Sequence, residues 1–108
     1  MTTAMTAAEQ AHALRAAARF IEDAQMPHLT ISVHGDGTIS IHVGQDAGPA
    51  AARIAAVAVL AAATGAGGAA RTTYPTWSAV HSAGTGWIDG HDVRIGTYIG
   101  THEEDERA

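Results

Sequence analysis

The most constraining feature of this sequence is an alternation of apolar and polar residues that runs through residues 29–43 and is interrupted by Gly35-Asp36-Gly37. Successive side chains of a strand point to opposite faces, so a period of two is typical of a strand with one covered face. The stretch therefore predicts a β-hairpin with one apolar face and one polar face. The apolar positions are Leu29, Ile31, Val33, Ile39, Ile41 and Val43.

The length of the turn decides whether the two apolar sets share a face. A two-residue loop at residues 36–37 pairs Val33 with Ser40 and sends the two sets to opposite faces. A three-residue loop at residues 35–37, with Gly37 left-handed, pairs Val33 with Ile39 instead. We predict the three-residue loop, which also gives the cross-strand pairs Ser32–Ser40 and Thr30–His42.

A first helix is predicted from a capping box, Thr6-Ala-Ala-Glu9, in which the Thr6 hydroxyl accepts from the Glu9 amide. It should end near Gln25, because Pro27 disfavours helical geometry in the residue before it. Arg19 and Asp23 are spaced for an ion pair along the helix. The apolar stripe at helical spacing consists of Leu14, Ala17, Ala18, Ile21 and Ala24.

A second helix should begin at Pro49, capped by Asp46 or Gly48, and run to about Thr64. The glycines of residues 65–68 then supply a left-handed cap. Apart from its one arginine and Thr64, this helix is apolar on all sides, so we expect more than one side to be covered. One cover is the sheet, and the other is the first helix or another subunit.

The last third of the chain is rich in β-branched and aromatic residues with glycines between them, and predicts three strands at about 72–82, 85–89 and 92–100. The last two are joined by a turn whose central residues are Asp89-Gly90 or Gly90-His91. Either choice places Ile88 on the same face as Val93 and Ile95, and Trp87 on the face of Arg94 and Tyr98.

The predicted fold class is α+β, with the order α-β-β-α-β-β-β, a mostly antiparallel sheet and both helices on one face. Residues 1–101 form one domain, a size at which a single core is feasible. Residues 102–108 form an acidic tail, of a kind that is usually solvated and disordered.

Composition excludes several classes of function. The net charge is −5, and the basic side chains are scattered arginines without a lysine, so nucleic-acid binding is not expected. The longest apolar run, residues 54–63, is half the ~20 residues needed to cross a bilayer, and the N-terminus does not resemble a signal peptide. We expect a cytoplasmic protein that does not bind membranes. With no cysteine, thiolate chemistry is excluded.

No catalytic residues are assigned, because no nucleophile lies next to a base at a useful spacing. His81 and Ser82 are neighbours on a predicted strand and therefore point to opposite faces. The sequence accordingly favours a non-enzymatic protein, with no cofactor expected. The enzyme alternative requires a site that is completed across a dimer interface.

The candidate binding residues are Trp87, Arg94 and Tyr98. We expect Arg94 to lie opposite Trp87, where it can make a cation–π contact, and these residue types are enriched at interface hot spots. The competing interpretation is that this face is the packed core and that the face of Ile88 points outward.

A second hypothesis is a metal or small-ligand site built from histidines and carboxylates. Its candidate ligands are His28 and His42 on the polar face of the hairpin, and Asp89, His91 and Asp92 around the later turn. Neither set is complete alone.

The function favoured by the sequence is a small interaction module that binds another protein or itself. The second helix, the Trp87-bearing hairpin and any uncovered edge strand favour a homodimer.

Overall fold

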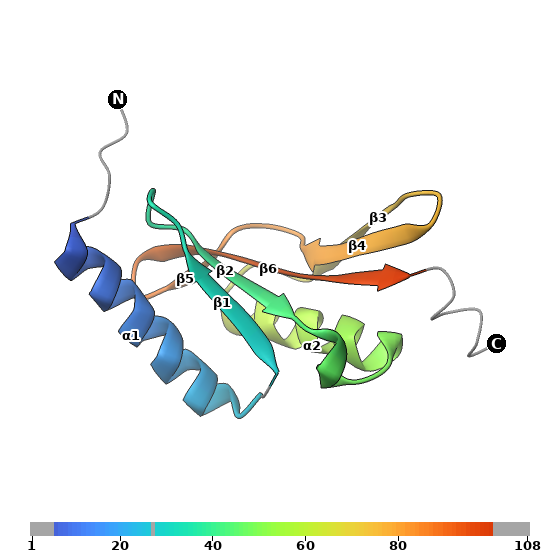
Figure 1. Ribbon diagram of the computed structural model, residues 1–108, viewed down its shortest axis with the longest axis horizontal. Coiled ribbons are helices and arrows are strands. Elements are labelled where there is room, and N and C mark those ends of the chain that lie inside the picture. Colours follow the sequence, from blue (N-terminus) through green and yellow to red (C-terminus); the bar gives the residue numbers. More distant parts are fainter. Residues whose placement is uncertain (1–5, 27, 101–108) are drawn as a thin grey trace.

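Figure 1 shows the computed structural model of the chain, in which residues 6–26 and 28–100 are described. The described residues form two α-helices, one short 3₁₀ helix and one six-stranded sheet. In chain order the elements are α1 (Ala7–Ala24), β1 (Leu29–Val33), β2 (Ile39–Val43), η1 (Gln45–Ala47), α2 (Ala50–Ala63), β3 (Ala69–Thr73), β4 (Trp77–Ser82), β5 (Gly86–Ile88) and β6 (His91–Gly100).

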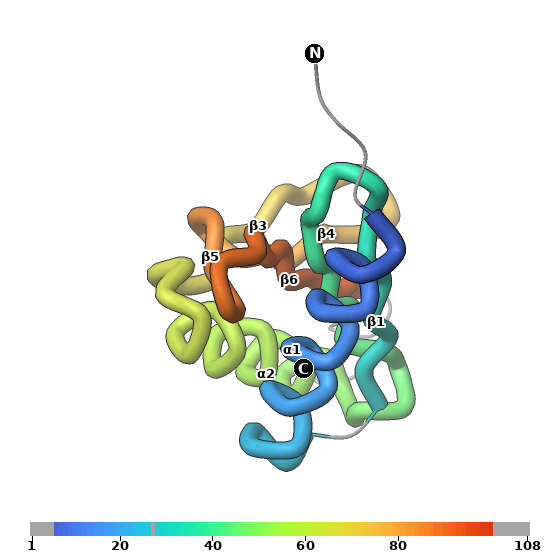
Figure 2. The backbone as a smooth tube through the Cα atoms, turned by 90° about the vertical axis from the view of Figure 1, so that its left-hand side faces the viewer, coloured from blue at the N-terminus to red at the C-terminus, as the bar shows by residue number. Residues whose placement is uncertain are grey.

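The sheet has the strand order β1-β2-β6-β4-β3, and β5 also pairs with β6. All strand pairs are antiparallel except β2 with β6, which run parallel and are connected through α2 and the strands that follow it. The view in Figure 2 shows α2 below β6, with β3 and β4 above it. The predicted α+β class, with two helices and a mostly antiparallel sheet, is confirmed.

The first hairpin has the predicted register. Val33 pairs with Ile39, and the hydrogen bonds His34 N–H to Thr38 O and Gly37 N–H to His34 O close the three-residue loop. Gly37 has a φ of 93°, the left-handed conformation that a bulge of this type requires. The parity argument therefore identified the correct turn.

The predicted strand at 72–82 is wrong in one respect, because it is two strands. β3 and β4 form a hairpin in which Thr73 pairs with Ser78 and the Tyr74 amide donates to the Trp77 carbonyl at 2.8 Å. Pro75 lies in this turn, where its missing N–H costs no ladder hydrogen bond. β3 is consequently an edge strand.

The first helix begins as predicted, with the Thr6 hydroxyl accepting from the Glu9 amide at 3.1 Å, and Gln25 ends it in a left-handed cap. The predicted apolar stripe is correct in part. Ala17 is buried and Ile21 and Ala24 are partly buried, but Leu14 and Ala18 are exposed, so the buried face is rotated relative to the prediction. Leu14 is 47% exposed, whereas three alanines are fully buried against the sheet. Alanines allow a close approach of helix to sheet but contribute little hydrophobicity. The hydropathy pattern therefore predicted that α1 exists but did not predict which side of it faces the sheet. The buried alanines are Ala13, Ala16 and Ala17.

The second helix begins one residue after its N-cap, Pro49, and ends at a Schellman motif. Gly65, with a φ of 80°, donates to the Ala62 carbonyl, and the Ala66 amide donates to the Ala61 carbonyl. This confirms the predicted left-handed glycine cap. On the outer side of the helix Val59 remains 57% exposed. No helix in the described ranges is long and apolar enough to span a membrane.

The core lies between one face of the sheet and the two helices. Alternate residues of β2, β4 and β6 are buried there, together with residues of α1 and α2. Ile88 shares this core with Val93 and Ile95, so the interpretation that their face points outward is wrong. The opposite face of the sheet, which we call the open face, is covered by no described element.

Candidate functional site

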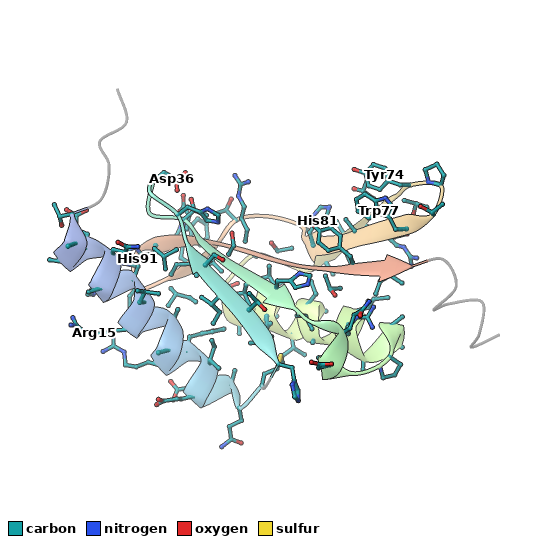
Figure 3. The ribbon with its side chains drawn as sticks, in the orientation of Figure 1. Arg15, Asp36, Tyr74, Trp77, His81 and His91 are labelled. Atoms are coloured by element: carbon teal, nitrogen blue, oxygen red, sulfur yellow. The ribbon has the colours of Figure 1, made fainter. Side chains whose placement is uncertain are left out.

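The open face carries a row of aromatic side chains, which we call the aromatic strip: Tyr74, Trp77 and Tyr98. The rings of Tyr74 and Trp77 stack with centroids 4.2 Å apart, and Trp77 meets Tyr98 edge-on at 5.4 Å. Figure 3 shows Tyr74 and Trp77 together at the end of the β3–β4 hairpin. The tight turn brings the first two rings together, and the pairing of Ala79 with Tyr98 places β6 beside them.

The strip is exposed although it is large and apolar. The exposed fractions are 44% for Tyr74, 38% for Trp77 and 59% for Tyr98. Single exposed apolar residues are ordinary, but a contiguous group on one face is typical of an interaction surface. The strip is therefore the first element of the candidate site.

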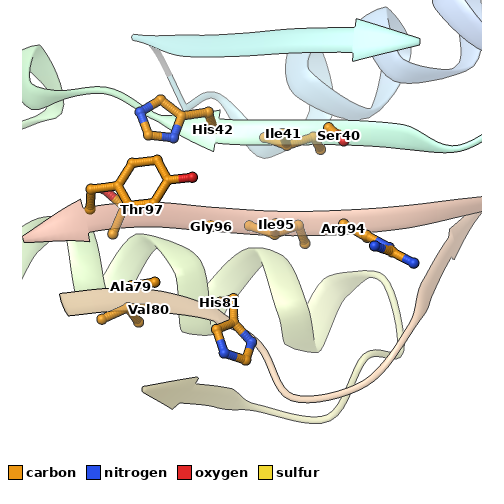
Figure 4. Close-up of a pocket in the computed structure, with 11 residues that line it drawn as sticks. Ser40, Ile41, His42, Ala79, Val80, His81, Arg94, Ile95, Gly96 and Thr97 are labelled. Atoms are coloured by element: carbon orange, nitrogen blue, oxygen red, sulfur yellow. The ribbon is translucent and has the colours of Figure 1, made fainter. Parts of the chain in front are cut away.

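A hollow of about 230 Å³ lies beside the aromatic strip (Figure 4). We call it the Gly96 hollow. Gly96 pairs with His42 on β2 and with His81 on β4, so two imidazoles stand on either side of a residue that has no side chain. Because neighbouring strands are ~4.8 Å apart, this gap is about as wide as one side chain. Other lining residues on the open face are Ser40, Ala79, Arg94 and Tyr98.

The polar side chains around the hollow differ in the hydrogen bonds and contacts that they already make within the protein. His81 Nδ1 lies 3.0 Å from the Ser82 carbonyl, to which it donates, and its Nε2 lies 3.4 Å from the Thr72 hydroxyl. These two contacts therefore hold the His81 ring in place at one side of the hollow. The His42 ring packs beside Tyr98, with centroids 5.5 Å apart. Arg94 is exposed and makes no ion pair with any described residue.

A serine–histidine contact also lies on this face. His34 Nε2 is 2.8 Å from Ser40 Oγ, which is hydrogen-bond distance for a nucleophile and a base. Within the described part of the chain, no carboxylate is hydrogen-bonded to the His34 ring to orient it. Asp36, the nearest acid in sequence, instead accepts from the Thr38 amide at 3.0 Å. The expected separation of His81 and Ser82 is confirmed, since Ser82 is buried and His81 exposed.

The structure separates the predicted binding residues. Arg94 and Tyr98 both line the Gly96 hollow, but Trp87 lies opposite Asp92 and near Gly65 at the end of α2. The turn between β5 and β6 is centred on Asp89-Gly90, both with positive φ, as in a type I′ turn. The register that placed Arg94 opposite Trp87 is therefore wrong.

The predicted metal ligands point in different directions. Asp89 forms an ion pair with Arg19 at 2.9 Å, which also corrects the predicted pairing of Arg19 with Asp23. His91 Nε2 lies 2.9 Å from His12 Nδ1 on α1. His28 has a φ of 65° and lies outside β1. Among the described residues, no three histidine or acidic side chains are arranged to hold a metal ion.

The His12–His91 pair lines a second hollow at the end of the sheet where α1 begins. Its volume is about 350 Å³. Three carboxylates and two imidazoles surround it, and they come from α1, the first hairpin and β6. The ionisable lining residues are Glu9, His12, Asp36, His91 and Asp92.

Sequence reasoning missed most of the residues around the Gly96 hollow and the strip. Tyr74 and Trp77 were placed on one continuous strand, and His81 and Gly96 are brought together by pairing between distant strands. One signal was present, because Pro75 inside an apparent strand indicates a turn. A turn there would have placed Tyr74 and Trp77 side by side.

Comparison with known proteins identifies no relative, since no family model, curated protein or solved structure matches this chain.

Proposed function

We propose that this protein is a small non-enzymatic interaction module that binds another protein, or a second copy of itself, through the open face of its sheet. The observation that carries the proposal is the aromatic strip, in which three large, exposed rings are in contact on a face that no described element covers. Tyrosine and tryptophan supply much contact area for little loss of conformational entropy, and they are typical of interface hot spots.

The composition of the site supports binding rather than catalysis. The residues that line the Gly96 hollow include no carboxylate that could act as an acid or base. The Ser40–His34 contact supports the enzyme alternative, and it makes that alternative testable. We expect no labelling of Ser40 by a serine-directed fluorophosphonate; stoichiometric labelling, lost in Ser40→Ala, would favour an acyl-transfer enzyme.

The second candidate, a metal binder, is supported by one observation, the contact between the His12 and His91 rings. Its test is Zn²⁺ titration by calorimetry on the purified chain. Stoichiometric binding that is lost in His12→Ala and retained in His42→Ala would favour a metal site at the end of α1.

The first experiment for the interaction module is native mass spectrometry of the untagged chain over a range of concentrations, because it reports both subunit number and retained ligand. A homodimer formed through the strip is expected to dissociate at least tenfold more readily in Trp77→Ser. The matched control is Val59→Ser, which alters an exposed apolar residue on α2 and should leave association unchanged.

Other outcomes of that experiment assign the interface differently. If Val59→Ser dissociates the dimer and Trp77→Ser does not, the interface is the outer side of α2. If Trp87→Ser alone does so, the interface is the surface at the β5–β6 turn that the sequence favoured. A chain that remains monomeric contradicts self-association and leaves a different protein as the only partner class.

A further inference from the structure

We propose that the Gly96 hollow anchors an acidic, extended segment of a protein partner, one carboxylate of which pairs with Arg94. This inference rests on the proposed function and specifies the partner's chemistry. It is carried by three features: the charge of the hollow, its width, and its position beside the aromatic strip.

The charge of the hollow differs from that of the chain. The sequence has eleven acidic and six basic residues, yet the ionisable groups that line the hollow are Arg94, Tyr98 and two histidines. Within the described ranges, no aspartate or glutamate lines it. Since Arg94 has no ion-pair partner among the described residues, its guanidinium is available for a carboxylate from outside.

Asp92, on the same face of β6, makes no ion pair with Arg94. Asp92 is two residues away, roughly 6.6 Å along a strand. It lies opposite Trp87 and lines the second hollow rather than the Gly96 hollow. Arg94 therefore makes no ion pair with a described carboxylate, and it lies four residues before Tyr98 of the aromatic strip on the same face of β6.

The dimensions of the hollow fit a side chain better than a cofactor. Its volume of about 230 Å³ is below the ~300–1,000 Å³ of ordinary small-molecule sites. The walls are His42 and His81, and the floor is the backbone at Gly96 (Figure 4). A segment that runs along β6 would place one side chain in this gap and its alternate side chains on Arg94 and on Tyr98, because the three positions follow one another at every second residue of the same strand.

The same charges disfavour a second copy packed face to face. A symmetric pairing of open faces brings the Arg94 side chains of both copies to one interface, where the two guanidinium charges repel. An acidic segment has the opposite sign and removes this penalty. In the Gly96 hollow the occupant is therefore an acidic segment, and a homodimer that forms through the aromatic strip has to keep the Arg94 side chains of its two copies apart.

The test uses a labelled, end-blocked peptide, Gly-Glu-Glu-Tyr-Glu-Glu-Gly, and the full chain at low ionic strength, with binding followed by fluorescence anisotropy. We expect saturable binding, and at least tenfold weaker binding of the peptide with glutamine in place of glutamate. Arg94→Glu and the milder Arg94→Gln should each weaken binding by at least tenfold, because both remove the cation from an exposed position without burying a new group.

The matched control is Arg15→Glu, which makes the same change of net charge at an exposed position on α1 (Figure 3). It should change affinity by less than twofold. Equal losses in Arg94→Glu and Arg15→Glu would show long-range attraction rather than a site, and would overturn the proposal. Ala79→Leu, which fills the hollow from β4, should also abolish binding; unchanged affinity overturns the assignment to the hollow.

Two further outcomes separate this inference from the proposed function. If no acidic peptide binds while self-association of the chain still depends on Trp77, the proposal that the Gly96 hollow binds an acidic segment is wrong. The proposed function as an interaction module is then still supported. A ten-residue thymidine oligonucleotide that binds more tightly than the peptide, with the same dependence on Arg94, overturns the peptide class in favour of single-stranded nucleic acid.

Discussion

Gly86 lies where β5 passes the end of α2, and among the described glycines it has the least room for a side chain. A Cβ atom at this position would lie 2.3 Å from the Thr64 hydroxyl oxygen and 2.6 Å from the Thr64 Cβ. Thr64 has no space to withdraw, because it is 4% exposed and its hydroxyl donates to the Leu60 carbonyl. Close packing of α2 on the sheet therefore requires glycine here.

Gly86→Ala is expected to lower the free energy of unfolding by about 1–3 kcal/mol, the usual cost of overpacking a core. The measurement is urea unfolding followed by circular dichroism. Gly68→Ala serves as the control, since nothing lies within 4 Å of a Cβ there and its φ is not positive. Equal losses in both variants would contradict the packing argument.

Asp36 gives a prediction about pH. The backbone hydrogen bond from Thr38, with a smaller effect of nearby His34, lowers the pKa of the Asp36 carboxyl below its ordinary value of 3.8. The folded state then binds this proton less readily than the unfolded chain does. Its stabilising effect is therefore present above pH 3.8 and is lost as the pH falls through the lowered pKa. NMR titration of the carboxyl carbon should give a pKa below 3.8; a higher value would contradict the turn geometry.

At the scale of the element, α1 depends on a cap made by one side chain. The Thr6 hydroxyl satisfies the Glu9 amide, which has no partner within the helix. Thr6→Ala should lower the free energy of unfolding by ~1 kcal/mol, whereas Thr6→Ser keeps the acceptor and should have little effect. Thermal unfolding of the two variants checks this, and similar losses in both would mean that the methyl group matters rather than the cap.

At the scale of the whole molecule, Arg53 joins α2 to the sheet. The side chain is 2% exposed; Nη1 donates to the Gly48 carbonyl at 2.9 Å, and Nη2 donates to the Tyr98 carbonyl at 3.0 Å. β2 pairs with β6 only as far as Gly96, so β6 continues past the end of its neighbour. The buried guanidinium donates a hydrogen bond to the backbone of β6 beyond this point, at Tyr98, which also belongs to the aromatic strip.

Arg53→Met keeps much of the apolar volume but removes the donors from two carbonyls. We expect a loss of about 1–3 kcal/mol for each carbonyl left without a partner. Denaturant unfolding measures the loss, with Arg15→Met as the exposed control on α1. An unchanged stability in Arg53→Met would show that water or another group replaces the guanidinium.

The predictions that succeeded rest on residues close together in the sequence. The Thr6 cap, the three-residue turn with Gly37 and the glycine cap at Gly65 were all identified from local spacing and from the need for positive φ. Tyr98 and Arg94 were correctly placed on one face by the alternation of β6. In each case the physical cause acts within a few residues, so the sequence alone carries it.

The predictions that were wrong, and the features that were not predicted, depend on packing and pairing between elements that are far apart in the sequence. The rotation of α1 depends on alanines that fit closely against the sheet, and hydropathy alone does not reveal that fit. The aromatic strip requires the pairing of β4 with β6.

The sequence by itself thus determined the two helices with their caps, the turn and faces of the first hairpin, and the alternation of β6, because backbone sterics and periodicity act locally. It did not reveal the β3–β4 hairpin. The tertiary structure alone decided the site. The parallel pairing of β2 with β6 places His42 beside Gly96, and the antiparallel pairing of β4 places His81 on its other side. These registers join residues that are 54 and 15 positions apart in the sequence. Over such separations the free energy of packing the whole core, rather than any local preference, fixes which strands are neighbours.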